Sequence, residues 1–213
     1  MNKKRLFRSI ASAMLLGVFT LSSCVQMDNY ELYDDDSECL FVRRKSFKDN
    51  GNGSDPYQIA KDWVNKYEQP APKECFTYAL HLFSGKTMAQ IRNTIGPVIF
   101  DYWGHGNHWE QDYFNCVVNG PSLPTFDYEK ESWMIGSVCG AYSVSWTDWN
   151  QYLNSHIHGE YIDKKVLILL SDIHCGVLTG FKVDRWGNVI VKVHDQYGTQ
   201  TEYDASSIDS VYW

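Results

Sequence analysis

The sequence predicts an α+β fold, with helices in the N-terminal part and an antiparallel sheet in the C-terminal part. Apolar residues recur at helical spacing between positions 56 and 95, whereas a continuous apolar run at 166–170 is typical of a buried strand. Turn-forming residues then separate two further apolar segments. Consecutive helices followed by consecutive strands favour segregated layers. The 213 residues, 44% of them hydrophobic, are enough for one globular domain.

Three helices are expected first. Residues 56–67 have an amphipathic pattern, and 75–84 carry one apolar face, with Gly85 suited to the C-terminal cap. Thr87 is expected to cap a third helix, ended by Gly96-Pro97. Residues 100–132 have weak periodicity and many turn formers, so short strands and loops that wall a cleft are predicted there.

The C-terminal part predicts one more helix and a β-meander. Thr147 is expected to cap a helix that ends near Gly159. Strands are predicted at 166–170, 174–183 and 189–194, and residues 184–188 supply the turn between the last two.

Residues 1–23 are interpreted as an export signal. A basic start precedes an apolar run at 10–21, which is shorter than the roughly 20 residues needed to cross a bilayer. The run ends in Leu21-Ser22-Ser23-Cys24, which resembles the lipobox of bacterial lipoproteins. The resemblance implies that Cys24 is lipidated and anchors the mature protein to the bacterial cell envelope, at the outer membrane, its periplasmic face or the cell surface. The alternative is an ordinary secretory signal with a coincidental cysteine.

Residues 24–54 are predicted to be a flexible acidic tether, and 55–213 the folded domain. The tether is rich in turn formers and contains the run Asp34-Asp35-Asp36, interpreted as a solvated spacer rather than a calcium or partner site. The formal charge of the chain is -7, the wrong sign for neutralising phosphates, so nucleic acid is not an expected partner.

The six cysteines show no Cys-x-x-Cys spacing and give no support for a structural zinc site. Export permits disulfides. Four cysteines could form up to two bridges or remain buried thiols, and the sequence does not decide between these: Cys39, Cys116, Cys139 and Cys175.

Cys75 is the candidate nucleophile because it opens an apolar helix. A helix N-terminus lowers the pKa of a thiol and favours the reactive thiolate. His174 at a strand start and Asp195 at the end of the next strand are the candidate base and orienting carboxylate. A hairpin tip at 184–185 makes them face each other, and a tip one residue later places them diagonally at roughly 7 Å. A tip at 186–187 separates them by roughly 13 Å, so that a bulge is needed.

These residues resemble the papain-like cysteine peptidases, above all the bacteriocin-processing peptidases of double-glycine leaders and their exported relatives. The resemblance covers roughly Glu68 to the C-terminus and rests on Gln69, on Cys75 opening the helix, on His174 before a hydrophobic strand, and on Asp195. It implies a papain-like fold and hydrolysis of peptide or isopeptide bonds in a peptide or protein substrate, without a cofactor. It implies Gln69 as oxyanion donor, Cys75 as nucleophile, His174 as base and Asp195 as its orienter. The chain departs from the family in the residues that follow Cys75 and Asp195, which are Phe76 and Gln196.

Three other hypotheses remain. Cys139 with His174 and Asp195 resembles the transglutaminase-like order, although residues 142–146 alternate like a strand and would deny Cys139 a helix N-terminus. Metal hydrolysis could use His105, His108 and Glu110, or His156 and His158, but neither set has the helical His-Glu-x-x-His pattern and no metal is expected. A tethered binding or inhibitory lipoprotein on the same fold could present a face of exposed tryptophans, for which the candidates are Trp109, Trp133, Trp146 and Trp149. No pattern in the chain indicates an oligomeric state.

Overall fold

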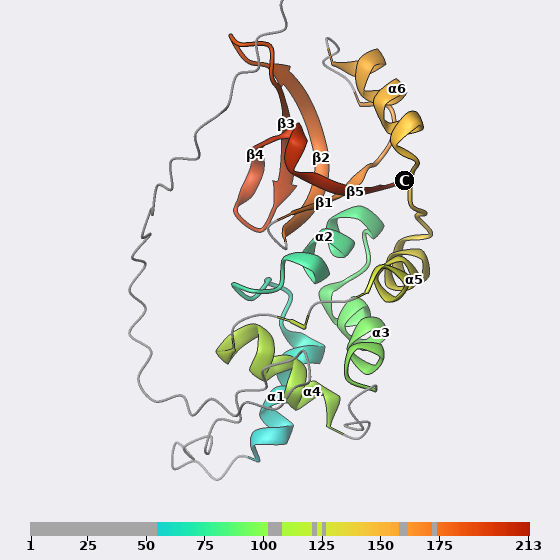
Figure 1. Ribbon diagram of the computed structural model, residues 1–213. Helices are drawn as coiled ribbons and strands as arrows, with labels where there is room; N and C mark the ends of the chain where they lie inside the picture. The colour runs from blue at the N-terminus through green and yellow to red at the C-terminus, as the bar shows by residue number, and fades with distance from the viewer. Residues whose placement is uncertain (1–54, 102–107, 121–122, 125–126, 158–161, 172–173) are drawn as a thin grey trace, which may run out of the picture.

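The computed structural model describes residues 55–101, 108–120, 123–124, 127–157, 162–171 and 174–213 (Figure 1). It confirms the predicted α+β architecture, with helices N-terminal and an antiparallel sheet C-terminal. The predictions made for residues 1–54, which include the signal, the lipidated Cys24, the tether and Cys39, lie outside the described residues.

The first two helices follow their predicted boundaries closely. Helix α1 spans Pro56–Lys66, and the Asp55 carboxylate caps it by accepting a hydrogen bond from the Tyr57 N–H at 3.1 Å. Helix α2 spans Cys75–Ser84 and ends at Gly85, whose φ of 72° is the left-handed conformation that glycine adopts without strain. The prediction that Cys75 opens a helix is confirmed.

Helix α3, Met88–Asp101, is longer than predicted. Thr87 caps it as expected, through a capping box in which the Thr87 and Gln90 side chains each accept the other's backbone N–H. The expected end at Gly96-Pro97 is wrong, because burial outweighs the hydrogen bond that a proline removes: Ile99 and Phe100 beyond it are buried. Gly96 admits the ring of Trp109, which lies 2.2 Å from where a β-carbon would stand.

The prediction of short strands and loops over 100–132 is wrong. The described part of this stretch holds α4, Trp109–Phe114, the π-helical turn Asn115–Asn119 and the start of α5, Tyr128–Cys139. Tertiary packing overrides the weak periodicity here, since α4 packs against α1 and α3, with Tyr113 and Val117 buried in the common core. Helix α6, Trp146–His156, forms near its predicted place, but its cap is Ser145 rather than Thr147.

The sheet is antiparallel, in the order β4-β3-β2-β1-β5. The predicted strands appear as β1, Leu167–Leu170, β2, His174–Val183, and β3, Val189–Asp195. Two edge strands were not predicted: β4, Gly198–Asp204, whose side chains are mostly polar, and β5, Ile208–Tyr212, which is short.

Two hydrophobic cores cover the two faces of the sheet. One face, with Leu167, Leu169 and Cys175, packs against α2 and the other N-terminal helices. The opposite face, with Ile168 and Leu178 among its residues, packs against α6. Helix α2 makes extensive contact with β2, and the start of α2 lies close to the end of β2 at which His174 lies, since Cys75 and His174 are in hydrogen-bond contact.

Candidate active site

Cys75 is half-buried at the first position of α2, where backbone N–H groups lack helical partners. The pKa of its thiol is lowered to about 5. The largest cause of this lowering is a hydrogen bond from the Cys175 thiol, whereas burial acts in the opposite direction and raises the pKa. The pKa is lowered further by a hydrogen bond with His174, by the charge of that imidazole and by the Phe76 N–H. Cys75 is therefore a thiolate near neutral pH.

His174 connects Cys75 to Asp195. Its Nε2 lies 2.9 Å from Asp195 Oδ2, which leaves Nδ1 for the hydrogen bond with Cys75. Burial lowers the pKa of the imidazole, but the hydrogen bonds with Cys75 and Asp195 outweigh it, and the pKa is raised. The ring stacks on Tyr197 at 5.4 Å between centroids and lies against Tyr203 at 5.6 Å.

Asp195 is fixed by donors from the turn after it and from β4. Its Oδ1 accepts from the Tyr197 and Gly198 N–H groups at 2.8 and 3.1 Å and from Thr201 Oγ1 at 3.0 Å. Its Oδ2 accepts from Tyr203 Oη at 2.7 Å and faces His174. These bonds outweigh burial and lower the pKa of the carboxyl, so Asp195 is ionised and its orientation is set from both sides.

A bulge in β2 brings His174 and Asp195 to the same face of the sheet. The hairpin tip lies at Trp186, because Val183 pairs with Val189. Continued without interruption, that register would place Asp195 opposite Val177, on the other face from His174. The extra residue Thr179 shifts the register by one, so that Val177 pairs with His194 and Asp195 lies beside Gly176, diagonal to His174. Gly176 allows this approach, since a β-carbon there would lie 3.2 Å from Asp195 Cβ.

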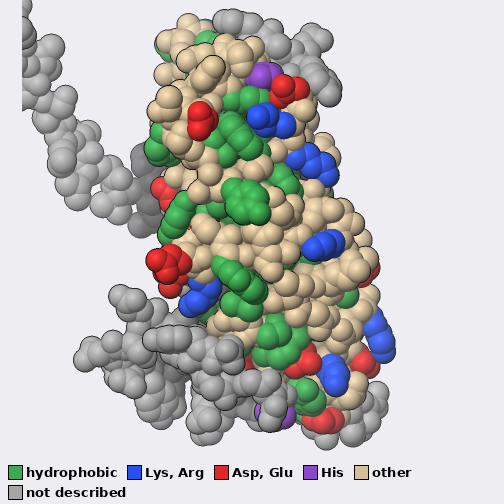
Figure 2. All heavy atoms as spheres, turned by 90° about the vertical axis from the view of Figure 1, so that its right-hand side faces the viewer, with side chains coloured by type: hydrophobic (Ala, Val, Ile, Leu, Met, Phe, Trp, Pro, Cys, Tyr) green, Lys and Arg blue, Asp and Glu red, His purple; other side chains and the backbone are tan. Residues whose placement is uncertain are grey.

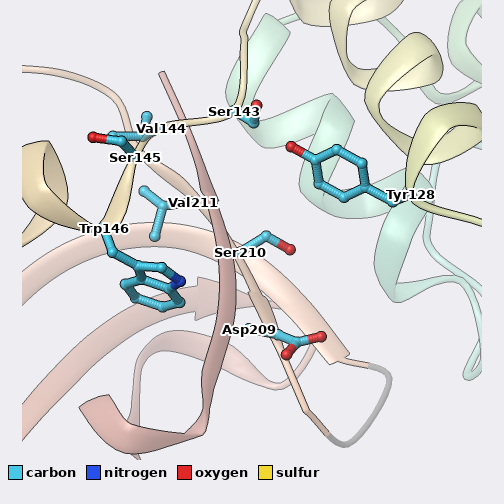
Figure 3. A pocket seen from close by; sticks show the side chains of 8 residues that line it. All are labelled: Tyr128, Ser143, Val144, Ser145, Trp146, Asp209, Ser210 and Val211. Atoms are coloured by element: carbon cyan, nitrogen blue, oxygen red, sulfur yellow. The ribbon is translucent and has the colours of Figure 1, made fainter.

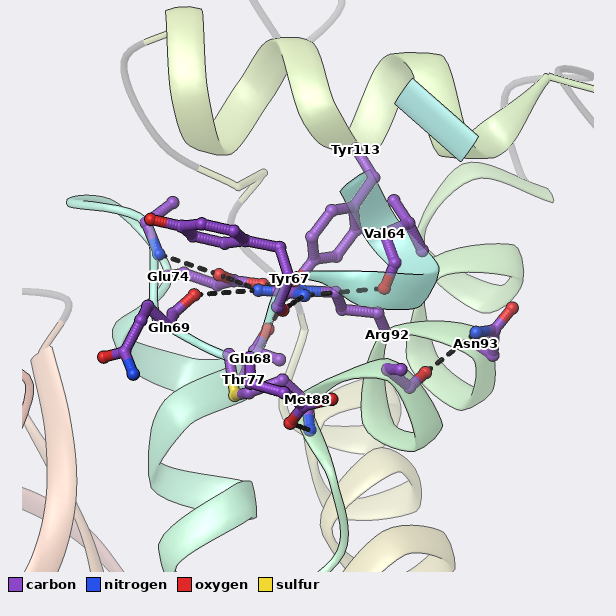
Figure 4. A network of polar contacts seen from close by, with 12 residues as sticks. Val64, Tyr67, Glu68, Gln69, Glu74, Thr77, Met88, Arg92, Asn93 and Tyr113 are labelled. Carbon is purple, nitrogen blue, oxygen red and sulfur yellow. Dashed lines mark hydrogen bonds and ion pairs between the residues drawn. The ribbon is translucent and has the colours of Figure 1, made fainter. Parts of the chain in front are cut away.

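Gln69, the predicted oxyanion donor, lies on the loop before α2 with its side chain exposed. Its carbonyl accepts a hydrogen bond from Arg92 Nη2 at 3.2 Å, and Figure 4 shows its amide turned away from Arg92. The contact with Arg92 therefore fixes the Gln69 carbonyl, whereas the amide lies on the exposed side of the loop.

A buried ion pair that no local sequence pattern indicates holds this loop (Figure 4). Arg92 Nε lies 2.6 Å from Glu74 Oε1 and Nη2 lies 2.9 Å from Oε2, and both side chains have no exposed area. Glu74 also accepts from Tyr113 Oη and from the Ala71 N–H, while Arg92 donates to backbone carbonyls, including that of Tyr67. The network ties the residue before Cys75 to the whole preceding loop.

Gln196 joins the two halves of the site. It follows Asp195 in the turn after β3, and its Nε2 donates to the Pro72 carbonyl at 3.0 Å. The loop before Cys75 is thereby bonded to the turn beside Asp195.

Cys139, the rival nucleophile, ends α5 rather than opening a helix. Burial raises the pKa of its thiol to about 11, and its sulfur lies 3.8 Å from the Leu80 carbonyl. His174 is in contact with Cys75, so the geometry favours Cys75. Within the described chain none of these four cysteines is part of a disulfide: Cys75, Cys116, Cys139 and Cys175.

The other candidate sites are only partly described. His105 and His158 lie outside the described residues, and elsewhere no group of three or more His, Cys, Asp or Glu could hold a metal ion. Of the four tryptophans considered for a binding face, Trp109 and Trp149 are buried, while Trp133 and Trp146 are about half exposed, at 51% and 53%. Hydrophobic side chains recur over the face of the molecule shown in Figure 2.

A hollow of about 230 Å³ lies over β5, between Tyr128 and Trp146 (Figure 3). Asp209 and Ser210 of β5 line it as well. Beside it, burial and the charge of Asp209 raise the pKa of Glu131 to about 7. None of Cys75, His174 and Asp195 lines this hollow, so it is distinct from the thiol site.

Comparisons with known protein families, with curated proteins and with solved structures found no match to this chain. Over the described residues, no helix combines the length and apolar character that a membrane span requires.

Proposed function

We propose that this protein is a papain-like cysteine hydrolase that cleaves peptide or isopeptide bonds. The observation that carries the proposal is the chain of contacts from the Cys75 thiol through the His174 ring to the buried Asp195 carboxylate. The lowered pKa of Cys75 and the raised pKa of His174 both favour the thiolate–imidazolium pair that thiol catalysis requires, and the lowered pKa of Asp195 favours an ionised carboxylate.

In this mechanism the Cys75 thiolate attacks the carbonyl carbon of the scissile bond. The backbone N–H of Cys75 and the Gln69 amide would stabilise the oxyanion, and the exposed Gln69 side chain would have to turn toward Cys75 to do so. The His174 imidazolium gives its proton to the leaving amine, which departs and leaves a thioester on Cys75. Neutral His174 then takes a proton from the water that hydrolyses the thioester, which regenerates the ion pair.

Labelling with iodoacetamide at pH 6 tests the thiol. With a pKa of about 5, about nine-tenths of Cys75 is thiolate at that pH, against a fraction of about 10⁻⁵ for Cys139 with a pKa of about 11. The weaker nucleophilicity of a low-pKa thiolate reduces this advantage, and an alkylation rate on the order of 10²-fold higher at Cys75 is expected. Peptide mapping by mass spectrometry reads the rates directly.

His174→Ala should slow labelling of Cys75 by about 3- to 10-fold, because the imidazolium is lost while the Cys175 hydrogen bond remains. His194→Ala is the matched control, since His194 lies in the neighbouring strand against Tyr78 and should leave the rate unchanged. Preferential labelling of Cys139 would support the transglutaminase-like hypothesis instead. Equal, slow labelling of all thiols would support a binding lipoprotein without activity.

The same pair predicts a bell-shaped pH profile of kcat/KM. Activity should rise with pH through about 5, as Cys75 loses its proton, and fall only above pH 6.5, where His174, with its raised pKa, becomes neutral.

We propose further that the protein is exported and held to the cell envelope by lipid on Cys24. Its basis is the lipobox-like sequence around Cys24. Cys24→Ala should move the protein from the membrane fraction to the soluble fraction of fractionated cells, with Cys39→Ala as the control. Unchanged membrane partition of the Cys24 variant would contradict the proposal.

A further inference from the structure

The Cys75 and Cys175 side chains meet where α2 packs on the sheet. Cys175 directly follows His174 in β2 and pairs with Leu169 of β1. Its side chain belongs to the core between the sheet and the helices, and Cys75 packs against that core. The two side chains are in hydrogen-bond contact, and neither is part of a disulfide in the structure.

We propose that Cys75 and Cys175 form a reversible disulfide, which makes the pair a site of oxidative modification that blocks the nucleophile. The effect on hydrolysis rests on the proposed function, whereas the formation of the bond depends only on the two thiols.

The two thiols differ as an attacking and a resolving cysteine do. Cys75 is half-buried and anionic near neutral pH, so it is the sulfur that a peroxide reaches and oxidises. Cys175 is 3% exposed, and burial raises its pKa, so it stays a protected thiol until its neighbour is oxidised. Cys139 is only partly buried; its pKa is also raised, but its thiol donates to the Leu80 carbonyl instead.

The chemistry balances with hydrogen peroxide as the oxidant. The Cys75 thiolate attacks one peroxide oxygen, the O–O bond breaks, and a sulfenic acid and hydroxide result. The Cys175 sulfur then attacks the Cys75 sulfur; the S–O bond breaks, and the departing hydroxide takes the Cys175 proton to give water. The two sulfurs together lose two electrons to the peroxide. A dithiol reductant returns both electrons and frees Cys75.

The disulfide would protect Cys75 from irreversible loss. A sulfenic acid without a neighbouring thiol is oxidised further to sulfinic and sulfonic acids, which ordinary reductants do not reverse. An exported protein meets oxidants routinely. There, the buried Cys175 thiol next to His174 would make the oxidation of Cys75 a reversible inactivation.

The test exposes the purified full-length protein to hydrogen peroxide, quenches it, unfolds it and alkylates the remaining thiols. Non-reducing peptide mapping should find the Cys75 and Cys175 peptides joined with the loss of two hydrogens, and dithiothreitol should restore both alkylated peptides. Cys175→Ser, whose hydroxyl can still donate a hydrogen bond to the Cys75 sulfur, should instead accumulate sulfinic and sulfonic acid at Cys75, and dithiothreitol should not reverse it. Cys175→Ala, the second variant, also removes that hydrogen bond and should form the same irreversible products more slowly. Cys139→Ser, the matched control, should form the disulfide normally.

The inference is overturned if oxidised wild-type protein carries sulfinic acid at Cys75 while Cys175 stays alkylatable, or if Cys75 pairs with Cys116 or Cys139. The proposed function fails separately. A disulfide that forms and reverses in a protein whose reduced form hydrolyses no peptide substrate would support the inference and contradict the hydrolase. Peptide hydrolysis that peroxide destroys irreversibly, without any disulfide, would do the opposite.

Discussion

Replacing Asp195 with Asn is expected to lower turnover by about 10⁴-fold, the scale seen when the orienting carboxylate of a catalytic triad becomes an amide. The donors around Asp195 determine which way the new amide points. Two backbone N–H groups and Thr201 Oγ1 all donate to the Oδ1 position, so the amide oxygen must occupy it. The amide NH₂ then faces His174 Nε2 and Tyr203.

With the amide in that orientation, the His174 imidazole can no longer act as the base. Nε2 must accept a hydrogen bond from the NH₂, so the proton of neutral His174 moves to Nδ1, the nitrogen left to contact Cys75. A ring with this tautomer cannot take a proton at Nδ1. The Tyr203 hydroxyl can turn to accept from the same NH₂, so we expect the fold to lose only about 1.5–3 kcal/mol, the value of a hydrogen bond to a charged group.

Turnover should be measured with a peptide that the wild-type protein is found to cleave, and folding by urea unfolding. Asp184→Asn is the control, because Asp184 is a carboxylate of the same hairpin that accepts only turn hydrogen bonds, far along the strands from the site. If Asp195→Asn cleaves at the wild-type rate per folded molecule but unfolds much more easily, Asp195 is a structural turn residue and the proposed role is wrong.

The sequence was sufficient for the parts of the fold that local patterns determine. The apolar face after Cys75 and the glycine at its end predicted α2 with its observed boundaries, and the continuous apolar run predicted β1. His174 and Asp195 were placed at strand ends, where the structure has them. These are short-range signals, in which the residues that specify an element lie within it.

The remaining features depend on contacts between distant residues. Because of the bulge at Thr179, Asp195 lies on the same face of the sheet as His174. An alternating apolar pattern does not reveal a bulge whose extra residue is not glycine. Strand β4 supplies Thr201 and Tyr203, which donate hydrogen bonds to Asp195. The sequence did not predict this strand because an edge strand needs little apolar surface, and the side chains of β4 are mostly polar. The contact between Cys75 and Cys175, 100 positions apart, follows only from how α2 packs on β2.

Arg92→Leu is expected to destabilise the protein by about 3–5 kcal/mol, because it leaves the Glu74 carboxylate buried without its counter-charge. Both side chains are fully buried, and Arg92 also stacks on Trp63 at 4.2 Å and holds carbonyls of the loop before α2. Urea unfolding measures the loss. Arg185→Leu, which changes an exposed arginine that also lies over a tryptophan ring, should stay within about 0.5 kcal/mol of wild type.

The double variant Glu74→Gln/Arg92→Leu distinguishes the destabilisation caused by the unpaired Glu74 carboxylate from the destabilisation caused by the lost packing of Arg92. If the buried carboxylate causes most of the loss, neutralising it should recover part of the stability, since an uncharged amide keeps an oxygen for Tyr113 and the Ala71 N–H. Neither variant should keep the full preference of iodoacetamide for Cys75, because the loop that Arg92 secures places the start of α2. A single variant as stable as wild type would show that Glu74 takes up a proton or finds another partner, and that the ion pair does not hold this loop.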